Sequence, residues 1–230
     1  MRAIAYQPLA RRLVPAALAF LAVIAPVVVA ACHDAQEQFE EKDFHPLVSG
    51  VDPQQFQLVG FGRETVAISE AGEVALSGSP SGYFATKEQF GDYVLRFDWK
   101  YDRPADLKDD AAFDGNSGVL LHIAEPHKVW PMCVEAQLMN RDAGHLFAIG
   151  GGKFSSRRSD EQRREAQQKA IKPVGEWNSE EIVCRNGTIR VTINGTLIDD
   201  GEGAEPSRGP IGWQSEGRPI RFRNLRINKL

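Results

Sequence analysis

Cysteine is scarce in this sequence, and its scarcity narrows the class of protein. The chain has 3 cysteines among 230 residues, too few for a small domain built on disulfide bonds. Basic residues are not in excess either: 27 Lys and Arg stand against 31 Asp and Glu. Nucleic-acid-binding domains usually carry a basic excess, so we expect no nucleic-acid partner. With 42% hydrophobic and 25% charged residues, the chain is neither mainly disordered nor a multi-span membrane protein.

The longest apolar run lies at the N-terminus. Residues 1–31 contain three arginines and no acidic residue, and an apolar run fills positions 13–29. Pro15 and Pro26 interrupt this run, which argues against a regular helix of the roughly 20 residues that cross a bilayer. A basic start, an apolar stretch and small residues at its end predict a secretory signal peptide over residues 1–31.

Val29-Ala30-Ala31-Cys32 resembles the bacterial lipobox. The resemblance implies that Cys32 is acylated and tethers an exported lipoprotein to a membrane. The anchor would hold the protein at the periplasmic face or the cell surface, and His33 favours the outer membrane by analogy. Plain secretion is the alternative. We interpret the polar residues 32–47 as a tether and residues 48–230 as the folded domain.

Short apolar or alternating runs, broken by Gly, Asn and Asp, predict β-strands in the mature chain. Asn186-Gly187 and Asn194-Gly195 each stand between β-type residues and predict tight type I′ hairpins. Many short strands with such turns predict an all-β fold of two stacked antiparallel sheets. The predicted strands are Tyr93–Lys100, Ser117–Ile123, Met132–Met139, Glu180–Arg185, Thr188–Asn194, Thr196–Asp199, Ile211–Gln214 and Ile220–Ile227.

Residues 155–170 differ from their surroundings, since they are polar on nearly every side and contain good helix formers. Without an apolar stripe they cannot form a core helix. We expect an exposed insertion that contains a short polar helix.

Six segments in order resemble the DUF1080 family, also called the 3-keto-disaccharide hydrolase domain, and their spacing agrees from about residue 48 to residue 230. The resemblance implies a concanavalin A-like jelly-roll sandwich whose concave sheet binds carbohydrate. It also implies cleavage of glycosides oxidised at C3. Three positions depart from patterns frequent in the family: His122, Asn140 and Glu216. The segments are Gly115–Leu121, Cys133–Leu138, Gly175–Asn178, Ile193–Gly195, Gly209–Gln214 and Phe222–Ile227.

The strand around Glu135 carries one carboxylate on its polar face, together with Gln137. A retaining glycosidase needs two carboxylates about 5–5.5 Å apart, so double displacement from this strand is not expected. A 3-keto sugar needs a single base, because the C3 carbonyl acidifies the hydrogen on C2. Abstraction, loss of the group at C1 and hydration would give a net hydrolysis.

The predicted catalytic residues are Glu135, as base or acid, and His122 and Glu216, which assist it. Two of these residues have an ordinary alternative: Glu135 could accept a sugar hydroxyl or form a salt bridge, and His122 could be a half-exposed strand end. His145 is a weaker candidate in a loop. Residues expected to bind substrate are Gln137, Asn116, Trp130, Gln214 and Arg223.

The sequence leaves the cofactor open. A divalent cation could polarise the ketone, but no compact histidine spacing and no CxxC motif points to its ligands. Pairing of Cys133 with Cys184 also stays open.

The leading expectation is an enzyme that cleaves an oxidised disaccharide or glycoside. A non-catalytic carbohydrate-binding module of the same fold is the alternative. A structural envelope protein, docking a partner through residues 155–170, is a third.

Overall fold

The computed structural model describes residues 39–230. The predicted signal peptide, Cys32 and the first part of the predicted tether lie outside the described residues. Within the described range, no helix is both long enough and apolar enough to cross a membrane.

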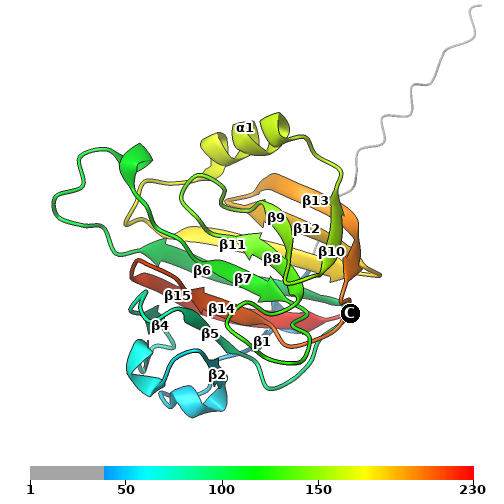
Figure 1. Cartoon of the computed structure of the whole chain (residues 1–230), viewed down its shortest axis with the longest axis horizontal. Helices are drawn as coiled ribbons and strands as arrows, with labels where there is room; N and C mark the ends of the chain where they lie inside the picture. The colour runs from blue at the N-terminus through cyan, green and yellow to red at the C-terminus, as the bar shows by residue number, and fades with distance from the viewer. Residues whose placement is uncertain (1–38) are drawn as a thin grey trace, which may run out of the picture. The chain divides into compact units, whose positions relative to one another are not determined.

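Two antiparallel sheets stack against each other, as predicted (Figure 1). In the described part of the chain, one sheet has nine strands and the other has six. The larger sheet runs in the order β10 (Lys153–Ser156), β13 (Thr196–Glu205), β12 (Thr188–Ile193), β11 (Asn178–Arg185), β6 (Tyr93–Tyr101), β15 (Ile220–Lys229), β4 (Val74–Leu76) and β3 (Val66–Ile68), with β1 (His45–Pro46) beside β15. The smaller sheet runs in the order β2 (Gln57–Val59), β5 (Gly82–Ala85), β14 (Gly212–Ser215), β7 (Gly118–Leu121), β8 (Cys133–Gln137) and β9 (Leu146–Ile149).

Both Asn-Gly hairpins are confirmed. They join β11 to β12 and β12 to β13, and both residues of each turn have positive φ: Asn186 50°, Gly187 73°, Asn194 50° and Gly195 81°. Asn and Gly are the residues that adopt these angles most readily. All eight predicted strands are present with shifted ends, and the largest change is β13, which extends to Glu205.

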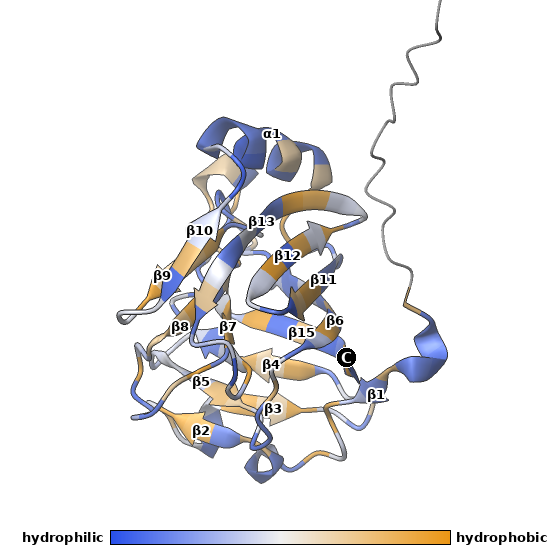
Figure 2. Ribbon diagram, turned by 90° about the vertical axis from the view of Figure 1, so that its right-hand side faces the viewer, coloured by the Kyte–Doolittle hydropathy of each residue, from blue (hydrophilic) through white to orange (hydrophobic). Residues whose placement is uncertain are grey.

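The alternation in β6 sets which side of its sheet meets the core. Tyr93, Leu95, Phe97 and Trp99 are buried in the core between the sheets, as the sequence pattern predicts. Figure 2 shows the resulting mixture of hydrophobic and hydrophilic positions along the strands.

The predicted polar helix is α1 (Asp160–Ala170), which lies beside β13 and is largely hydrophilic (Figure 2). Ser159 and Gln162 form a capping box at its start, which satisfies amide groups that the helix leaves free. The helix is less detached than expected, because Ala166 and Ala170 are buried against the core. Small side chains allow this close approach without an apolar stripe.

Short 3₁₀ helices occur at η1 (Glu41–Asp43), η2 (Pro53–Gln55), η3 (Arg63–Thr65) and η4 (Asp110–Ala112).

The folded unit begins at Phe39, earlier than the predicted domain start at residue 48. His45 and Pro46 pair with β15. The Phe44 ring packs under the Arg96 guanidinium, 4.3 Å from the ring centroid. The described end of the predicted tether is therefore part of the sandwich.

Cys133 and Cys184 are both buried and unpaired. Cys184 faces the core between the sheets, whereas Cys133 lies in a second cluster with Tyr83 and Leu120. Burial raises the pKa of both thiols, that of Cys184 to about 12. Both side chains therefore remain thiols at neutral pH.

Candidate functional site

The outer face of the six-stranded sheet, which points away from the core, carries a group of polar residues around Glu135. We call Glu135, Gln137, Gln214 and Glu216 the polar cluster. The strand register places Glu135 of β8 between Leu120 of β7 and Phe147 of β9. One row along the strands, Gly118 lies opposite Gln137. These residues share one face because neighbouring positions across antiparallel strands point the same way.

Gly118 creates the space in which two side chains meet. A Cβ atom at Gly118 would collide with Oε1 of Glu135 and would lie 2.6 Å from Oε1 of Gln214. The ends of these side chains, from β8 and β14, therefore converge over the bare backbone of β7. Both polar atoms of the Gln214 amide are buried without a hydrogen-bond partner. Such atoms are rare in folded proteins, which makes the Gln214 amide an unusual neighbour for Glu135.

Glu135 and Glu216 form a coupled acidic pair. Glu135 is 6% exposed; burial, and then the charge of Glu216, raise its pKa to about 7. Burial also raises the pKa of Glu216, against a hydrogen bond from Asn116 that lowers it. Asn116 and Glu216 are held side by side by a β-bridge. Two interacting carboxyl groups favour a state in which one holds a proton near neutral pH.

Gln137 is only half available to a ligand. Its Oε1 accepts the backbone N–H groups of Leu138 (2.9 Å) and Met139 (2.8 Å). The side-chain amide nitrogen remains as a donor on the same face as Glu135.

The loop between β7 and β8 covers the other half of this face. His127 Nδ1 accepts from Gln57 Nε2 at 2.5 Å, which ties the loop to β2. Beneath it, Tyr83 is fully buried and its hydroxyl has no partner. Trp130, on the same loop, is 48% exposed, as the expectation of a stacking platform requires.

Phe147 is a residue that the sequence interpretation missed. It lies directly across from Glu135, yet its ring is 38% exposed. An exposed aromatic ring beside a polar cluster is a typical surface for stacking a sugar or an apolar leaving group. No signal marked it, because residues 146–149 are apolar on both faces and show no strand alternation.

The structure does not bring His122 to Glu135, and this corrects the sequence expectation. Strand alternation after Leu120 would place His122 on the outer face, but its φ of 58° turns the side chain toward the opposite face. Its Nε2 lies 3.0 Å from the Gly91 carbonyl oxygen, and its ring packs against Tyr93 of β6. Burial lowers the pKa of His122, so the ring is neutral in the core at the end of the strand.

Arg223 is also removed from the cluster. It lies on the outer face of the nine-stranded sheet, where its Nε donates to Asp98 at 3.0 Å. Its guanidinium lies 4.1 Å from the centroid of the Trp177 ring. The predicted contact of Arg223 with substrate near Glu135 is corrected, because Arg223 belongs to a group of residues joined by an ion pair and hydrogen bonds around Asp98 on the other sheet.

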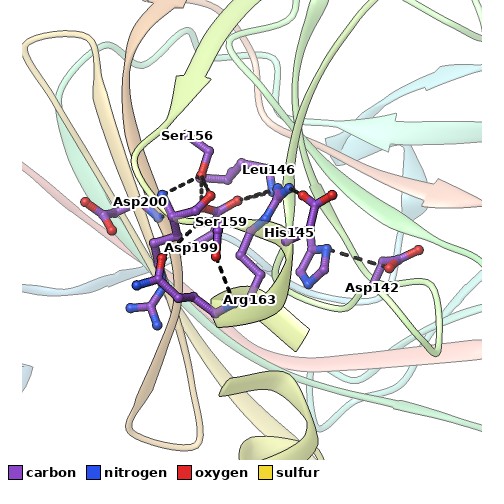
Figure 3. A network of polar contacts seen from close by, with 11 residues as sticks. Asp142, His145, Leu146, Ser156, Ser159, Arg163, Asp199 and Asp200 are labelled. Atoms are coloured by element: carbon purple, nitrogen blue, oxygen red, sulfur yellow. Dashed lines mark hydrogen bonds and ion pairs between the residues drawn. The ribbon is translucent and has the colours of Figure 1, made fainter. Parts of the chain in front are cut away.

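His145 belongs to a network that joins α1 to both sheets (Figure 3). Its Nδ1 lies 3.6 Å from Asp142, while burial and then the charge of Arg163 lower its pKa. Arg163 also donates to the fully buried Asp199 at 3.1 Å. Asp199 in turn accepts the N–H of Leu146 and the hydroxyl of Ser156. His145 therefore belongs to the contacts that hold α1 against the sheets and is not part of the group around Glu135.

The groups near Glu135 that could bind a metal ion are two carboxylates and the oxygens of side-chain amides. Within residues 39–230, no three His, Cys, Asp or Glu side chains form a group that could hold a metal ion.

Comparison with known proteins identifies the relatives of this arrangement. The model of the family described as a 3-keto-alpha-glucoside-1,2-lyase-like domain matches residues 43–228. The comparison with curated proteins gives no match.

Three solved structures share the fold. A candidate glycosyl hydrolase from Parabacteroides distasonis ATCC 8503 is 20% identical, with a TM-score of 0.59 over 84% of this chain and 98% of that chain. A second from the same strain is 19% identical, with a TM-score of 0.57 over 81% and 99%. The carbohydrate-binding module CBM66 from Bacillus subtilis is 12% identical, with a TM-score of 0.51 over 80% and 100%. At these identities the likeness shows the fold alone.

Proposed function

Because the chain belongs to the 3-keto-alpha-glucoside-1,2-lyase-like domain family, we propose that it cleaves 3-keto-glycosides on the outer face of its six-stranded sheet. The observation that carries the proposal is the buried Glu135 carboxyl group, whose pKa is raised to about 7 beside Glu216. A base of this pKa is half ionised near neutral pH and is strong enough to remove a proton next to a ketone.

Glu135 begins the reaction by taking the proton from C2 of the sugar. The electrons of the C2–H bond move toward the C3 carbonyl, whose oxygen becomes an enolate. The unpartnered Nε2 of Gln214 is the donor that we assign to this oxygen, since a fixed donor stabilises charge that develops during the reaction.

Loss of the leaving group follows. The enolate re-forms the C3 carbonyl, a double bond forms between C1 and C2, and the C1–O bond breaks. Glu135, which now holds the proton from C2, gives it to the departing oxygen, while the charge of Glu216 keeps Glu135 a strong enough base for the first step. Water then adds to C1 and C2 regains a proton, so the products are the 3-keto sugar and the free alcohol. Asn116 and the Gln137 amide nitrogen would bind hydroxyl groups, and Trp130 and Phe147 would stack against the rings.

The test is the release of the leaving group from a 3-keto-α-glucoside and from the unoxidised glucoside. We expect turnover of the oxidised substrate only, because the unoxidised sugar has no acidic hydrogen on C2. Equal turnover of both would contradict the elimination route.

A carbohydrate-binding module is the second candidate, supported by the fold shared with CBM66. It predicts sugar binding without turnover that survives Glu135→Ala.

We also propose that the protein is exported and anchored through lipid on Cys32, supported by the lipobox-like Val29–Cys32 segment. Cys32→Ser should move the protein from the membrane fraction to the soluble fraction after export. Retention of the variant in the membrane would contradict the lipid anchor.

A further inference from the structure

An open cavity of about 820 Å³ lies between α1, η4 and the loop that follows β8. Its wall includes Met139 and Arg141 from the loop, Arg164 and Gln168 from the helix, and Lys172 just after the helix. None of Glu135, Gln137, Gln214 or Glu216 lines it, so it is separate from the proposed reaction site. Its volume falls in the range of cavities that hold small organic ligands.

None of the three basic side chains on this wall forms an ion pair in the described part of the chain, although the charge of Arg164 acts on Asp160 one helical turn away. Arg141 donates through Nε and Nη2 to the Ala111 carbonyl oxygen, at 3.2 and 2.6 Å. Lys172 donates to the Trp177 carbonyl oxygen at 3.0 Å. Arg164 is exposed and forms no hydrogen bond or ion pair in residues 39–230.

One of the two acids on the wall, Asp110, is already engaged. Asp110 pairs with Arg103 at 2.6 Å and also accepts the N–H of Val174 at 2.8 Å. These contacts lower its pKa. Asp142 lies 3.6 Å from His145, whose lowered pKa leaves the Asp142 charge without a cationic partner. With Asp110 neutralised by Arg103, three basic side chains stand against one free carboxylate on this wall, an excess of positive charge in a chain whose formal net charge is −4.

Hydrogen bonds join the walls of the cavity. The Asn140 side chain donates to the carbonyl oxygens of Asp110 and Phe113, at 2.6 and 3.1 Å. Gln167, on the buried side of α1, donates to the Asn140 carbonyl oxygen at 2.8 Å. Because these hydrogen bonds already order the walls, binding would cost little conformational entropy.

We propose that this cavity binds an anionic saccharide, one that carries carboxylate or sulfate groups. Guanidinium groups bind such oxyanions with two parallel hydrogen bonds, which Arg164 is free to form. The Gln168 amide suits sugar hydroxyls, and the Met139 side chain offers an apolar surface to a sugar ring. The class of ligand rests on the carbohydrate chemistry of the family, and not on the reaction proposed for Glu135.

Calorimetric titration with an α-1,4-linked galacturonate trimer tests the proposal, with its methyl ester as the matched neutral ligand. We expect the acid to bind about tenfold or more tightly than the ester at low ionic strength, because each charged hydrogen bond contributes about 1.5–3 kcal/mol. A sulfated trisaccharide and inorganic sulfate separate the two anion types from a simple ion. Equal binding of acid and ester, or inorganic sulfate binding as well as either acidic saccharide, would overturn the proposal.

Variants locate the ligand. Arg164→Gln removes a guanidinium that holds no other group, so the fold should persist, and affinity should fall about tenfold. Arg141→Gln should add to the loss. Arg157→Gln is the matched control, because Arg157 pairs with Asp200 and Glu202 outside the cavity; its affinity should equal that of the wild type. Unchanged affinity in Arg164→Gln would overturn the assignment. Loss of binding in Glu135→Gln would place the ligand in the reaction site and overturn the proposal. Wild-type affinity in Glu135→Gln would support the cavity as the binding site, whatever the result of the 3-keto-glycoside assay.

Discussion

The outer faces of both sheets carry polar side chains, but the surroundings of those side chains differ. On the nine-stranded sheet, charges neutralise one another: Arg96 pairs with Glu181, and Arg221 with Asp102 and Glu73. On the six-stranded sheet, Glu135 is buried beside a second carboxyl group, and the Gln214 amide has no partner. Buried polar groups without partners cost stability, so a face that retains them is a better guide to function than a face rich in charge.

Gly118→Ala should have the largest effect, because it disturbs the arrangement that distinguishes the six-stranded face. The added Cβ collides with Glu135 Oε1 and crowds Gln214, so both side chains must leave the position they share. We expect 3-keto-glycoside turnover to fall by about a thousandfold. Gly91→Ala is the matched control, because its Cβ would meet nothing nearer than 3.6 Å. Full activity in Gly118→Ala would show that the convergence over β7 has no catalytic role.

The pH dependence should report the raised pKa of Glu135. The base must be ionised, so kcat/KM should rise with pH to a midpoint near 7, where the pKa of Glu135 lies. Activity at pH 5 should be about a hundredfold below that at pH 8. A midpoint near the ordinary glutamate value of 4.5 would contradict the assignment of Glu135 as base.

The raised pKa of Glu135 also makes the stability of the fold depend on pH. The folded pKa of Glu135 lies above its ordinary value, so the folded state holds the proton more tightly between pH 4.5 and 7. The free energy of unfolding should therefore decrease as pH rises through that window. Glu135→Gln should flatten this part of the stability profile, which chemical denaturation at several pH values can measure.

Phe147→Ala tests the aromatic surface beside Glu135. We expect about a tenfold rise in KM with kcat less affected, because stacking stabilises substrate and transition state alike. Phe147→Tyr, which keeps the ring, should restore the KM. Truncation of Val51, which is 52% exposed, serves as a surface control. An unchanged KM in Phe147→Ala would remove this ring from the binding site.

Arg223→Gln should have the smallest effect. Arg223 lies on the other sheet, paired with Asp98 and stacked on Trp177, so turnover should stay within about twofold of wild type. The loss in unfolding free energy should be below about 1 kcal/mol, as for other half-exposed ion pairs. A large loss of turnover would show that the paired face takes part in the reaction.

Alternation and turn chemistry made much of the fold predictable. The Asn-Gly pairs specified two hairpins, and the apolar face of residues 93–99 specified the core side of β6. The same alternation placed Glu135 and Gln137 on one face. Glu216 was predicted to assist Glu135, and the β-bridge to Asn116 shows how it is held at the end of β14, next to the start of β7.

The failures come from features that strand periodicity does not encode. The positive φ of His122 turns it into the core, and nothing in its neighbouring residues specifies that reversal. Arg223 follows a correct strand pattern, but the pattern does not say to which sheet β15 belongs. Phe147 lies in a run without alternation, so only the pairing of β9 with β8 reveals its position across from Glu135.

The most direct test of the central claim compares Glu135→Gln with Arg223→Gln on a 3-keto-α-glucoside, with both variants checked for a native thermal transition. The account predicts that Glu135→Gln loses about a thousandfold in turnover, as expected on removal of a general base, while Arg223→Gln remains close to wild type. Wild-type turnover in a folded Glu135→Gln variant would contradict the account.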